Sequence, residues 1–479
     1  MAVNGNNISV QKAFYNDSQM TDMNSLANAM LSKPTELSPI ITHLAGKESK
    51  RFPLSFLTEG VGNVKSIDRL EYEYRVKTHR LTTRPLAKDT IASPGAGNTF
   101  YLEFSDKWFI KDYVLVNGHG EQVRIMAEPI SVGSNYRYLV QQVNPDPTFT
   151  LTQGKIGDLW AQMYAPVGVD FSRGNASNWE VPGKVRNKIG TIRKSYHMSG
   201  NAKDFVAEFT LPKRGGGSTK LWMDYEEYQH MLNFKEECEM YYWYGQKTYD
   251  STGKSTMKDE NGQPVLVGPG LLEQVINKDT YSTLTEAKIK NIIGDLFYGM
   301  TDANAKQVTL YTGTGGAREF DEALKGHMGA DSNSWKVGGE NRFITGSGRS
   351  LGVTGYFTSY DHVDGHSVKV VKLPMFDHGP IADAREKHPV TGYSLESYRM
   401  VFVDQSNYDG QANVQMISKK GREMMRWCVA GSVVPRGFDS GSARASDVDG
   451  ASVHMLKTAG IVLKRFDTSL DIECTAASL

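Results

Sequence analysis

The amino-acid sequence predicts an α+β protein built from more than one lobe, for three reasons. Apolar and polar residues alternate between about 65 and 160, which is typical of strands. The stretch Trp222–Tyr244 contains no Gly or Pro and predicts one long helix. At 479 residues, the chain also exceeds the length that one compact core usually holds.

The composition limits the class of protein and its surroundings. Hydrophobic residues make up 39% and charged residues 23% of the chain, as in an ordinary globular protein. Basic and acidic residues number 54 each, so no overall charge draws the chain to nucleic acid or to a membrane. No signal peptide and no apolar run of about 18 residues occurs, and the three cysteines have no metal-ligand spacing. These features suit a protein made in a reducing cytoplasm.

Residues 1–60 mix Asn, Ser, Met and Pro with short apolar patches, and such a segment cannot form a core alone. Six large apolar side chains within it are costly to leave in water, at about 1.5–3 kcal/mol each. They are Phe14, Tyr15, Phe52, Leu54, Phe56 and Leu57. We therefore expect an N-terminal arm that lies on another surface.

Strand patterns dominate the next part of the chain. Apolar and charged residues alternate through 71–76, as in a strand with one covered face. Residues 114–125 read as two short strands joined by Asn117-Gly118-His119-Gly120, which predicts a hairpin with glycine in its turn. We interpret about 95–160 as an inserted β lobe.

A basic segment precedes an acidic helix. Between Glu180 and Asp204 there are six basic residues and no acidic one, whereas Asp224 to Glu239 contains six acidic residues and one Lys. Because the two segments have opposite charge, we expect them to dock within or between chains. The candidate subunit-contact residues are Lys184, Arg186, Lys188, Arg193 and Lys194 in the basic segment, and Glu226, Glu236 and Glu237 on the polar face of the helix.

Further helices and strands complete the chain. The apolar side of the long helix is broad and should be covered by several neighbours. Thr283-Leu284-Thr285-Glu286 predicts a capping box before a second helix that extends to Met300. A strand at 308–311, a glycine loop at 313–316 and a helix at 317–327 follow. Later strands are predicted at 353–360, 368–373, 398–403, 424–429 and 461–466.

Two motifs invite a chemical interpretation, and neither is complete. Residues 313–318, GTGGAR, follow a strand and precede a helix, where backbone N–H groups can hold phosphate, but the Lys-Ser/Thr of a P-loop is missing. Histidines and aspartates between His362 and His388 suggest a metal site, yet Asp364-Gly365 is a better hairpin turn. We therefore predict no catalytic, cofactor-binding or metal-binding residue and no enzyme activity.

Taken in order, several segments resemble the major capsid proteins of tailed bacteriophages, which have the Hong Kong ninety-seven type of fold, and most of all the crAss-like phage branch. The segments span roughly 180–435. They are PGKVRNKIGTIRKSYHMSGNA at 182–202, the long helix, GPGLLEQV at 268–275, VTLYTGTGGAREFDEALKG at 308–326, VKLPMFDHGP at 371–380 and WCVAGSVVPRGF at 427–438.

The resemblance implies a division of the chain. Residues 1–60 would be the N-terminal arm, and 61–215 an extended loop carrying the inserted β lobe. Residues 216–280 would form a peripheral domain with a spine helix at 222–244, 281–410 an axial domain, and 411–479 a return to the peripheral domain. The family often has a cleaved N-terminal scaffolding region, whereas this chain shows no long helical leader, so we expect a separate scaffold or none.

The resemblance also implies a structural function. The chain would assemble with itself into hexamers and pentamers of an icosahedral capsid shell around phage genomic DNA, in the virion and, beforehand, in the host bacterial cytoplasm. Portal, scaffold and capsid-decorating proteins would be partners, with non-specific proximity to double-stranded DNA and no membrane. Two alternatives stay open: a structural β protein of a phage tail or baseplate, and a phosphate- or sugar-processing enzyme.

Overall fold

The computed structural model describes most of the chain and divides it into two compact units. The described residues are 19–20, 53–60, 62–77, 83–90, 95–148, 150–152, 154–178, 181–201, 211–212, 218–219, 222–298, 307–325, 335–337, 359–362, 367–408, 410–434 and 445–475. The first unit comprises Met1–Tyr72 with Arg186–Leu479, and the second Glu73–Val185. Helices and strands both contribute throughout the first unit, which confirms the predicted α+β class.

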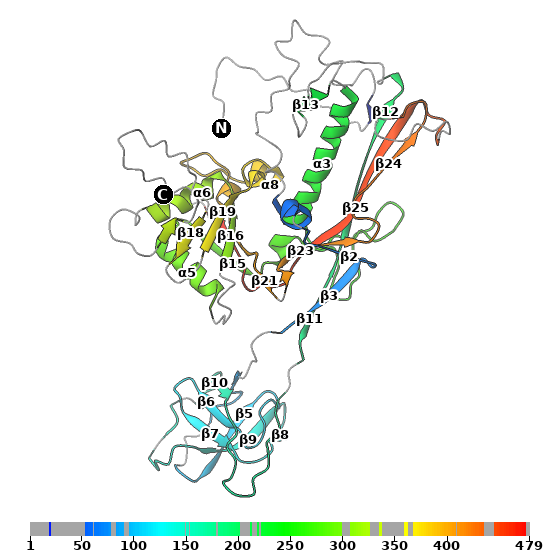
Figure 1. Cartoon of the computed structure of the whole chain (residues 1–479). Helices are drawn as coiled ribbons and strands as arrows, with labels where there is room; N and C mark the ends of the chain where they lie inside the picture. The colour runs from blue at the N-terminus through cyan, green and yellow to red at the C-terminus, as the bar shows by residue number, and fades with distance from the viewer. Residues whose placement is uncertain are drawn as a thin grey trace, which may run out of the picture. The chain divides into compact units, whose positions relative to one another are not determined.

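The second unit is a β lobe with its own core (Figure 1). Its strands are β4 (Thr83–Pro85), β5 (Thr99–Phe104), β6 (Val114–Asn117), β7 (Gln122–Ile125), β8 (Ile130–Val132), β9 (Asn135–Gln142) and β10 (Leu159–Gln162). They form one sheet in the order β4-β10-β6-β7-β9-β5, with β8 beside β9. The hairpin predicted at 114–125 is confirmed as β6 and β7, and Gly120 in its turn has a φ of +80°.

Alternate residues of these strands close the core of the β lobe. Leu102, Phe104, Tyr138 and Val140 are fully buried, and their strand neighbours point outward. Phe104 meets the ring of Tyr138 edge to face at 5.5 Å. The chain leads into and out of the lobe through β3 (Glu71–Val76) and β11 (Gly183–Lys188), which pair as a two-stranded sheet.

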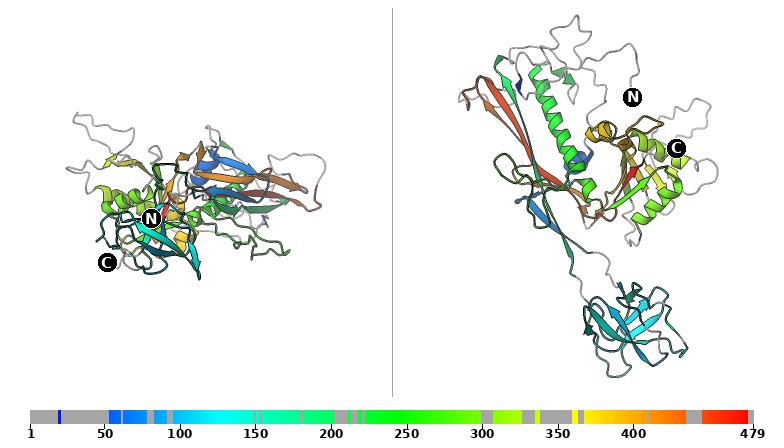
Figure 2. Two further views of the ribbon diagram at one scale, coloured as in Figure 1. Left: turned by 90° about the horizontal axis from the view of Figure 1, so that it is seen from below. Right: turned by 180° about the vertical axis from the view of Figure 1, so that it is seen from behind.

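A six-stranded sheet and a long helix form one half of the first unit. The sheet order is β1-β12-β25-β23-β2, with β24 also paired to β25. The strands are β1 (Gln19–Met20), β2 (Val64–Ile67), β12 (Gly190–Ser199), β23 (Val414–Lys419), β24 (Met425–Ala430) and β25 (Gly450–Leu463). Helix α3 (Trp222–Tyr244) lies along these strands in both Figure 1 and Figure 2. Its bounds are those predicted for the long helix.

The helix is buried against the sheet and other elements, as its broad apolar side predicted. Phe234, Cys238, Tyr242 and Trp243 are at most 2% exposed and join a cluster with residues of β12, β25, β16 and β20. The cluster also contains Leu54 from α2 (Pro53–Ser55), and Leu57 packs against it from η2 (Phe56–Gly60). These two side chains of the expected arm are therefore covered by their own chain. Phe14, Tyr15 and Phe52, and the Phe56 side chain, lie outside the described residues.

A seven-stranded mixed sheet forms the other half of the first unit. Its order is β15-β26-β20-β16-β19-β18-β17. The strands are β15 (Asn277–Tyr281), β16 (Gln307–Thr312), β17 (Trp335–Val337), β18 (Ser359–His362), β19 (Ser367–Lys372), β20 (Met400–Asp404) and β26 (Leu470–Cys474). Helices α5 (Glu286–Leu296) and α6 (Thr314–Lys325) and the 3-10 turn η4 (Leu395–Tyr398) bury Ile289, Phe320 and Leu395 against it.

Short elements connect the larger ones. They are β13 (Leu211–Pro212), β14 (Ser218–Thr219), α4 (Leu271–Gln274), α7 (Pro374–Asp377), α8 (Pro380–Ala384), β21 (Asn407–Tyr408) and β22 (Gln411–Ala412). No helix among the described residues is both long and apolar enough to span a membrane.

The second predicted helix ends at Leu296 rather than at Met300. Three other predicted boundaries are also wrong. The N-cap of α5 is Thr285 rather than Thr283, because the Thr285 side chain accepts the Lys288 N–H. Helix α6 begins at Thr314, so Gly315 and Gly316 form its first turn instead of a loop. The last long strand is β25, which starts at Gly450 and ends at Leu463 rather than covering 461–466. Residues 353–358 of another predicted strand lie outside the described part of the chain.

Candidate functional site

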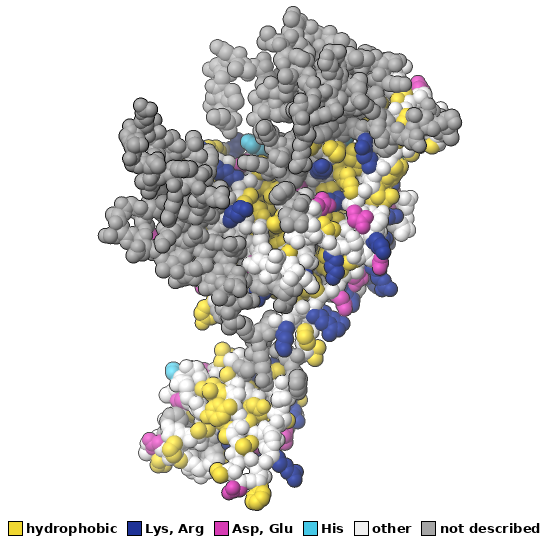
Figure 3. Space-filling model, in the orientation of Figure 1, with side chains coloured by type: hydrophobic (Ala, Val, Ile, Leu, Met, Phe, Trp, Pro, Cys, Tyr) yellow, Lys and Arg dark blue, Asp and Glu magenta, His cyan; other side chains and the backbone are white. Residues whose placement is uncertain are grey.

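Three of the candidate basic residues lie on β11, and two of them face acidic residues of β3. Arg186 Nε is 3.1 Å from Glu71 Oε1, and Lys184 Nζ is 3.9 Å from Glu73 Oε1. Figure 3 shows Lys and Arg side chains next to Asp and Glu side chains in the region of these two strands. Part of the positive charge of the basic segment is thus balanced within the chain. The sequence did not predict Glu71 and Glu73 as the partners.

The other three basic candidates also have partners in the chain. Lys188 Nζ donates a hydrogen bond to Gly253 O at 2.6 Å, and the guanidinium of Arg193 lies 5.4 Å from the Trp427 ring centre. Lys194 Nζ is 2.5 Å from Glu237 Oε1 on α3. Lys194 and Glu237 are therefore the one candidate pair that the described residues bring together. Such partly exposed ion pairs contribute about 0–1 kcal/mol each.

The two remaining acidic candidates belong to α3. Glu236 is half-buried, and the side chain of Glu226 lies outside the described residues. The expected docking of opposite charges is thus present within one chain at Lys194 and Glu237. Contacts of these residues with other copies stay a prediction.

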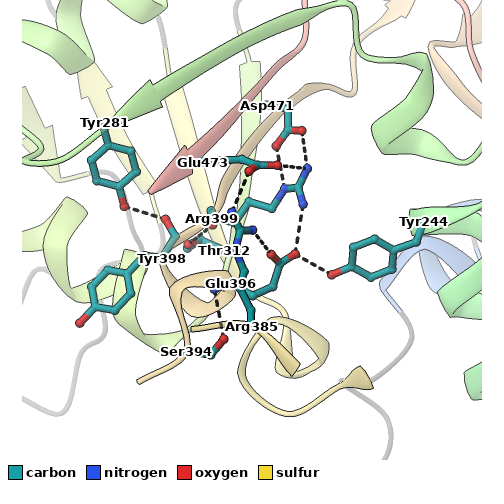
Figure 4. A network of polar contacts seen from close by, with 10 residues as sticks. All are labelled: Tyr244, Tyr281, Thr312, Arg385, Ser394, Glu396, Tyr398, Arg399, Asp471 and Glu473. Atoms are coloured by element: carbon teal, nitrogen blue, oxygen red, sulfur yellow. Dashed lines mark hydrogen bonds and ion pairs between the residues drawn. The ribbon is translucent and has the colours of Figure 1, made fainter. Parts of the chain in front are cut away.

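A buried cluster of charged side chains, which we call the Arg399 network, has no counterpart in the sequence predictions (Figure 4). Arg399 follows η4 and is 9% exposed; its Nε and Nη2 donate to the two carboxylate oxygens of Asp471 at 2.8 and 2.5 Å. Its Nη1 donates to Glu396 Oε1 at 3.2 Å, and its Nη2 lies 3.1 Å from Glu473 Oε1. Burial alone would lower the pKa of Arg399, but the hydrogen bond to Asp471 and the surrounding carboxylates raise it above its usual value.

A second arginine and a tyrosine complete the Arg399 network. Arg385, just after α8, donates to Glu396 Oε2 at 2.5 Å and to Glu473 Oε2 at 2.7 Å. The Tyr244 hydroxyl at the end of α3 donates to Glu396 Oε1 at 2.9 Å. The network thus ties the long helix to β26 of the seven-stranded sheet. Each of its three carboxylates pairs with at least one of the two arginines.

Backbone N–H groups of the glycine motif at 313–318 donate hydrogen bonds to other residues of the chain. The carboxylate of Asp377 accepts the Thr314 N–H and the Thr314 hydroxyl, both at 2.7 Å. The Gly315 N–H donates to Ser397 Oγ at 2.8 Å. A Cβ on Gly313 would lie 2.7 Å from Asp377 Oδ1, so this glycine is needed for close packing. A phosphate at the start of α6 would meet a carboxylate, which disfavours nucleotide binding there.

The described residues of the segment between His362 and His388 have separate roles. Asp377 caps α6, and the ring of His388 stacks on Tyr398 at 4.8 Å. His366 and the side chain of His362 lie outside the described residues. Among the residues with described positions, no group of three or more His, Cys, Asp or Glu side chains is arranged to hold a metal ion.

Comparison with known families decides the class of the protein. A model of the Crassvirus major capsid protein matches residues 4–477. The chain belongs to the Crassvirus major capsid protein family. It is a structural subunit of a phage capsid, as the resemblance implied, and the virion capsid is its location. The tail or baseplate alternative is thereby set aside.

Solved capsid structures are similar to this capsid subunit at low identity. A chain from a structure of Mycobacterium phage Ogopogo is 10% identical, with a TM-score of 0.35 and coverage of 94% of this chain and 99% of that one. A chain of the cyanophage P-SCSP1u capsid is 9% identical, with a TM-score of 0.33 and coverage of 65% and 82%. Because these TM-scores are low, the assignment depends on the family match. No curated protein sequence matches the chain.

Proposed function

We propose that this capsid subunit assembles with itself into hexamers and pentamers that close an icosahedral shell around phage genomic DNA in the host bacterial cytoplasm. The family match over residues 4–477 supports this proposal. Portal, scaffold and capsid-decorating proteins would be further partners. The function would be to form stable contacts between subunits. Such obligate interfaces commonly bury more than about 2,000 Å².

Electron microscopy of the purified full-length chain tests the assembly proposal. We expect closed shells or rings of five and six subunits when the protein is concentrated or expressed with the other capsid proteins. Discrete monomers under every condition, or open tubes, would contradict it.

We further propose that the basic segment and the acidic face of α3 contribute to contacts between subunits. The opposite charges of the two surfaces support this, while the pair of Lys194 and Glu237 lies within one chain at 2.5 Å. Two variants separate contacts within a chain from contacts between chains. One reverses the charge of Arg193 and Lys194 to Glu, and the other reverses Glu236 and Glu237 to Lys.

Mixing the two charge-reversal variants gives the decisive measurement. If the surfaces meet between chains, each variant alone assembles poorly, and the mixture regains part of the yield because opposite charges face each other again. Contacts confined to one chain leave the mixture as poor as its components. A variant with Lys258→Glu and Lys254→Glu, two exposed loop residues, controls for net charge.

A further inference from the structure

A buried carboxylate in the middle of α3 holds the segment Pro53–Gly60. Glu239 is 1% exposed, and its two oxygens accept four hydrogen bonds. The backbone N–H groups of Leu54 and Ser55 donate at 2.8 and 3.1 Å, and the Ser55 hydroxyl donates at 2.7 Å. The fourth donor is the indole N–H of Trp243 at 3.1 Å, one turn along the same helix. Three of the four donors therefore belong to the segment.

A second ion pair attaches the same segment to β25. Lys457 Nζ is 2.5 Å from Glu59 Oε1, and the Lys457 side chain is only 8% exposed. The ammonium group also lies 5.3 Å from the ring centre of Tyr242 on α3. Between the two attachments, Leu54 is fully buried and the Thr58 hydroxyl donates to Leu54 O at 2.7 Å.

The segment and its attachment sites depend on each other. Residues 53–60 form only a three-residue helical turn and a five-residue π turn, which are too short to persist without packing. If the segment left, Glu239 would keep only the Trp243 donor in an apolar surrounding, and a buried charge with few donors is costly. Burial raises the pKa of Glu239, while hydrogen bonds from Ser55 and Leu54 oppose that rise.

We propose that residues 53–60 form a clasp: a contact that opens separately from the rest of the subunit, with Glu239 and Lys457 as its two attachments. Neither residue touches a substrate or the Arg399 network in the described chain, so the role is conformational. Opening of the clasp would detach Pro53–Gly60 from α3 and β25 while both of these elements stay folded.

Hydrogen exchange of the full-length subunit with Glu239→Gln tests the clasp. The amide keeps the size of the side chain but replaces an oxygen that accepts two hydrogen bonds with a group that donates. We expect amide exchange in residues 54–60 to become about 10- to 100-fold faster, with α3 and β25 unchanged. The matched control is Glu237→Gln, the same substitution two residues away at a 46% exposed position, which should leave residues 54–60 unaffected.

A second variant keeps the test decisive if Glu239→Gln does not fold. Lys457→Met retains the packing on Tyr242 but loses the charge, and should also speed exchange in residues 54–60. Lys464→Met, further along the chain beyond β25, is its control. Unchanged exchange in the segment would overturn the proposal. So would an equal rise in the segment, α3 and the seven-stranded sheet, because the two attachments would then stabilise the whole core rather than a clasp.

Discussion

Single charged residues fix the geometry where the long helix meets the seven-stranded sheet. Within the Arg399 network two guanidinium groups face three carboxylates; Arg399 makes two hydrogen bonds to Asp471, and Arg385 makes one each to Glu396 and Glu473. Buried ion pairs of this kind seldom add much net stability, because the desolvation of both charges offsets their attraction. Their loss is costly nonetheless, since the remaining partners stay buried without a counter-charge. We infer that the network selects one arrangement of α3 and η4.

Replacing Arg399 by methionine should destabilise the subunit strongly. The substitution leaves Asp471, at 1% exposure, without its cation and removes one of the two arginines that pair with the fully buried Glu396. We expect a loss of about 3–5 kcal/mol in the free energy of unfolding, measured by denaturant titration. Arg422→Met, at an exposed position, should change it by less than about 0.5 kcal/mol. If the two substitutions lowered the free energy of unfolding equally, the Arg399 network would not be important for stability.

The Arg399 network should also make stability depend on acid. Burial raises the pKa of Glu473, but the hydrogen bond from Arg385 and the charges of Arg399 and Arg385 outweigh it, so the pKa is lowered from its ordinary 4.5. A carboxyl group with a lowered pKa stabilises the folded state when the pH is above its ordinary pKa. This stabilisation is lost as the pH falls toward and through the lowered pKa. Between about pH 5 and pH 3, the wild type should therefore lose more stability than Glu473→Gln in thermal unfolding. Glu260→Gln in an exposed loop should follow the wild type.

Individual elements differ in how well the sequence predicts them. Helix α3 has its predicted bounds, because no Gly or Pro interrupts its 23 residues. Strand β25 was found only at its C-terminal end, because Gly450, Lys457 and Gly460 break the apolar pattern. These residues are buried for tertiary reasons: a Cβ on Gly460 would lie 3.0 Å from Ile189, and Lys457 pairs with Glu59. Local pattern carries no information on such contacts.

The N-cap of α5 can be identified by two alanine substitutions. Thr285→Ala removes the oxygen that accepts the Lys288 N–H and should cost about 1 kcal/mol of unfolding free energy. Thr283→Ala, at the exposed position where the capping box was predicted, should be nearly neutral. If Thr283→Ala lowered the unfolding temperature more than Thr285→Ala, Thr283 would be the N-cap, as the predicted capping box requires.

Two glycines within helices should respond in opposite ways to alanine. A Cβ on Gly315 in α6 would lie 2.7 Å from the Tyr398 ring, so Gly315→Ala should destabilise by about 1–3 kcal/mol. Gly294 in α5 is exposed and has nothing within 4 Å of its Cβ position. There, alanine should stabilise by about 0.5–1 kcal/mol, because it favours the helix over the unfolded chain. Denaturant unfolding measures both changes. A stabilising effect of Gly315→Ala would contradict the close packing of Gly315 on Tyr398 at the start of α6.

At the scale of the whole molecule, the sequence predicted the class of protein better than its contacts. The order of segments led to the capsid family, and the family match confirms it. The partners of the basic candidates did not follow, because Glu71 and Glu73 lie more than 100 positions before Arg186 and Lys184 in the chain. The Arg399 network was missed for the same reason, since Arg399 and Asp471 are 72 positions apart. Charge runs show where ions are concentrated but not which ones pair.

Strands β25 and β26 follow every other strand of the two large sheets in the chain, and this order has a consequence for folding during translation. Strand β12 pairs with β25 as far as Ser199 with Gly450, and β26 joins β15 to β20, so both sheets of the first unit need residues after 449. All strands of the β lobe, by contrast, are contiguous between Thr83 and Gln162. We expect ribosome-bound chains stopped before Gly450 to yield a protease-resistant lobe and an unprotected first unit. A resistant first unit in such chains would refute this order. A subunit whose two large sheets close only after residues beyond 449 have been made cannot join a growing shell half-made.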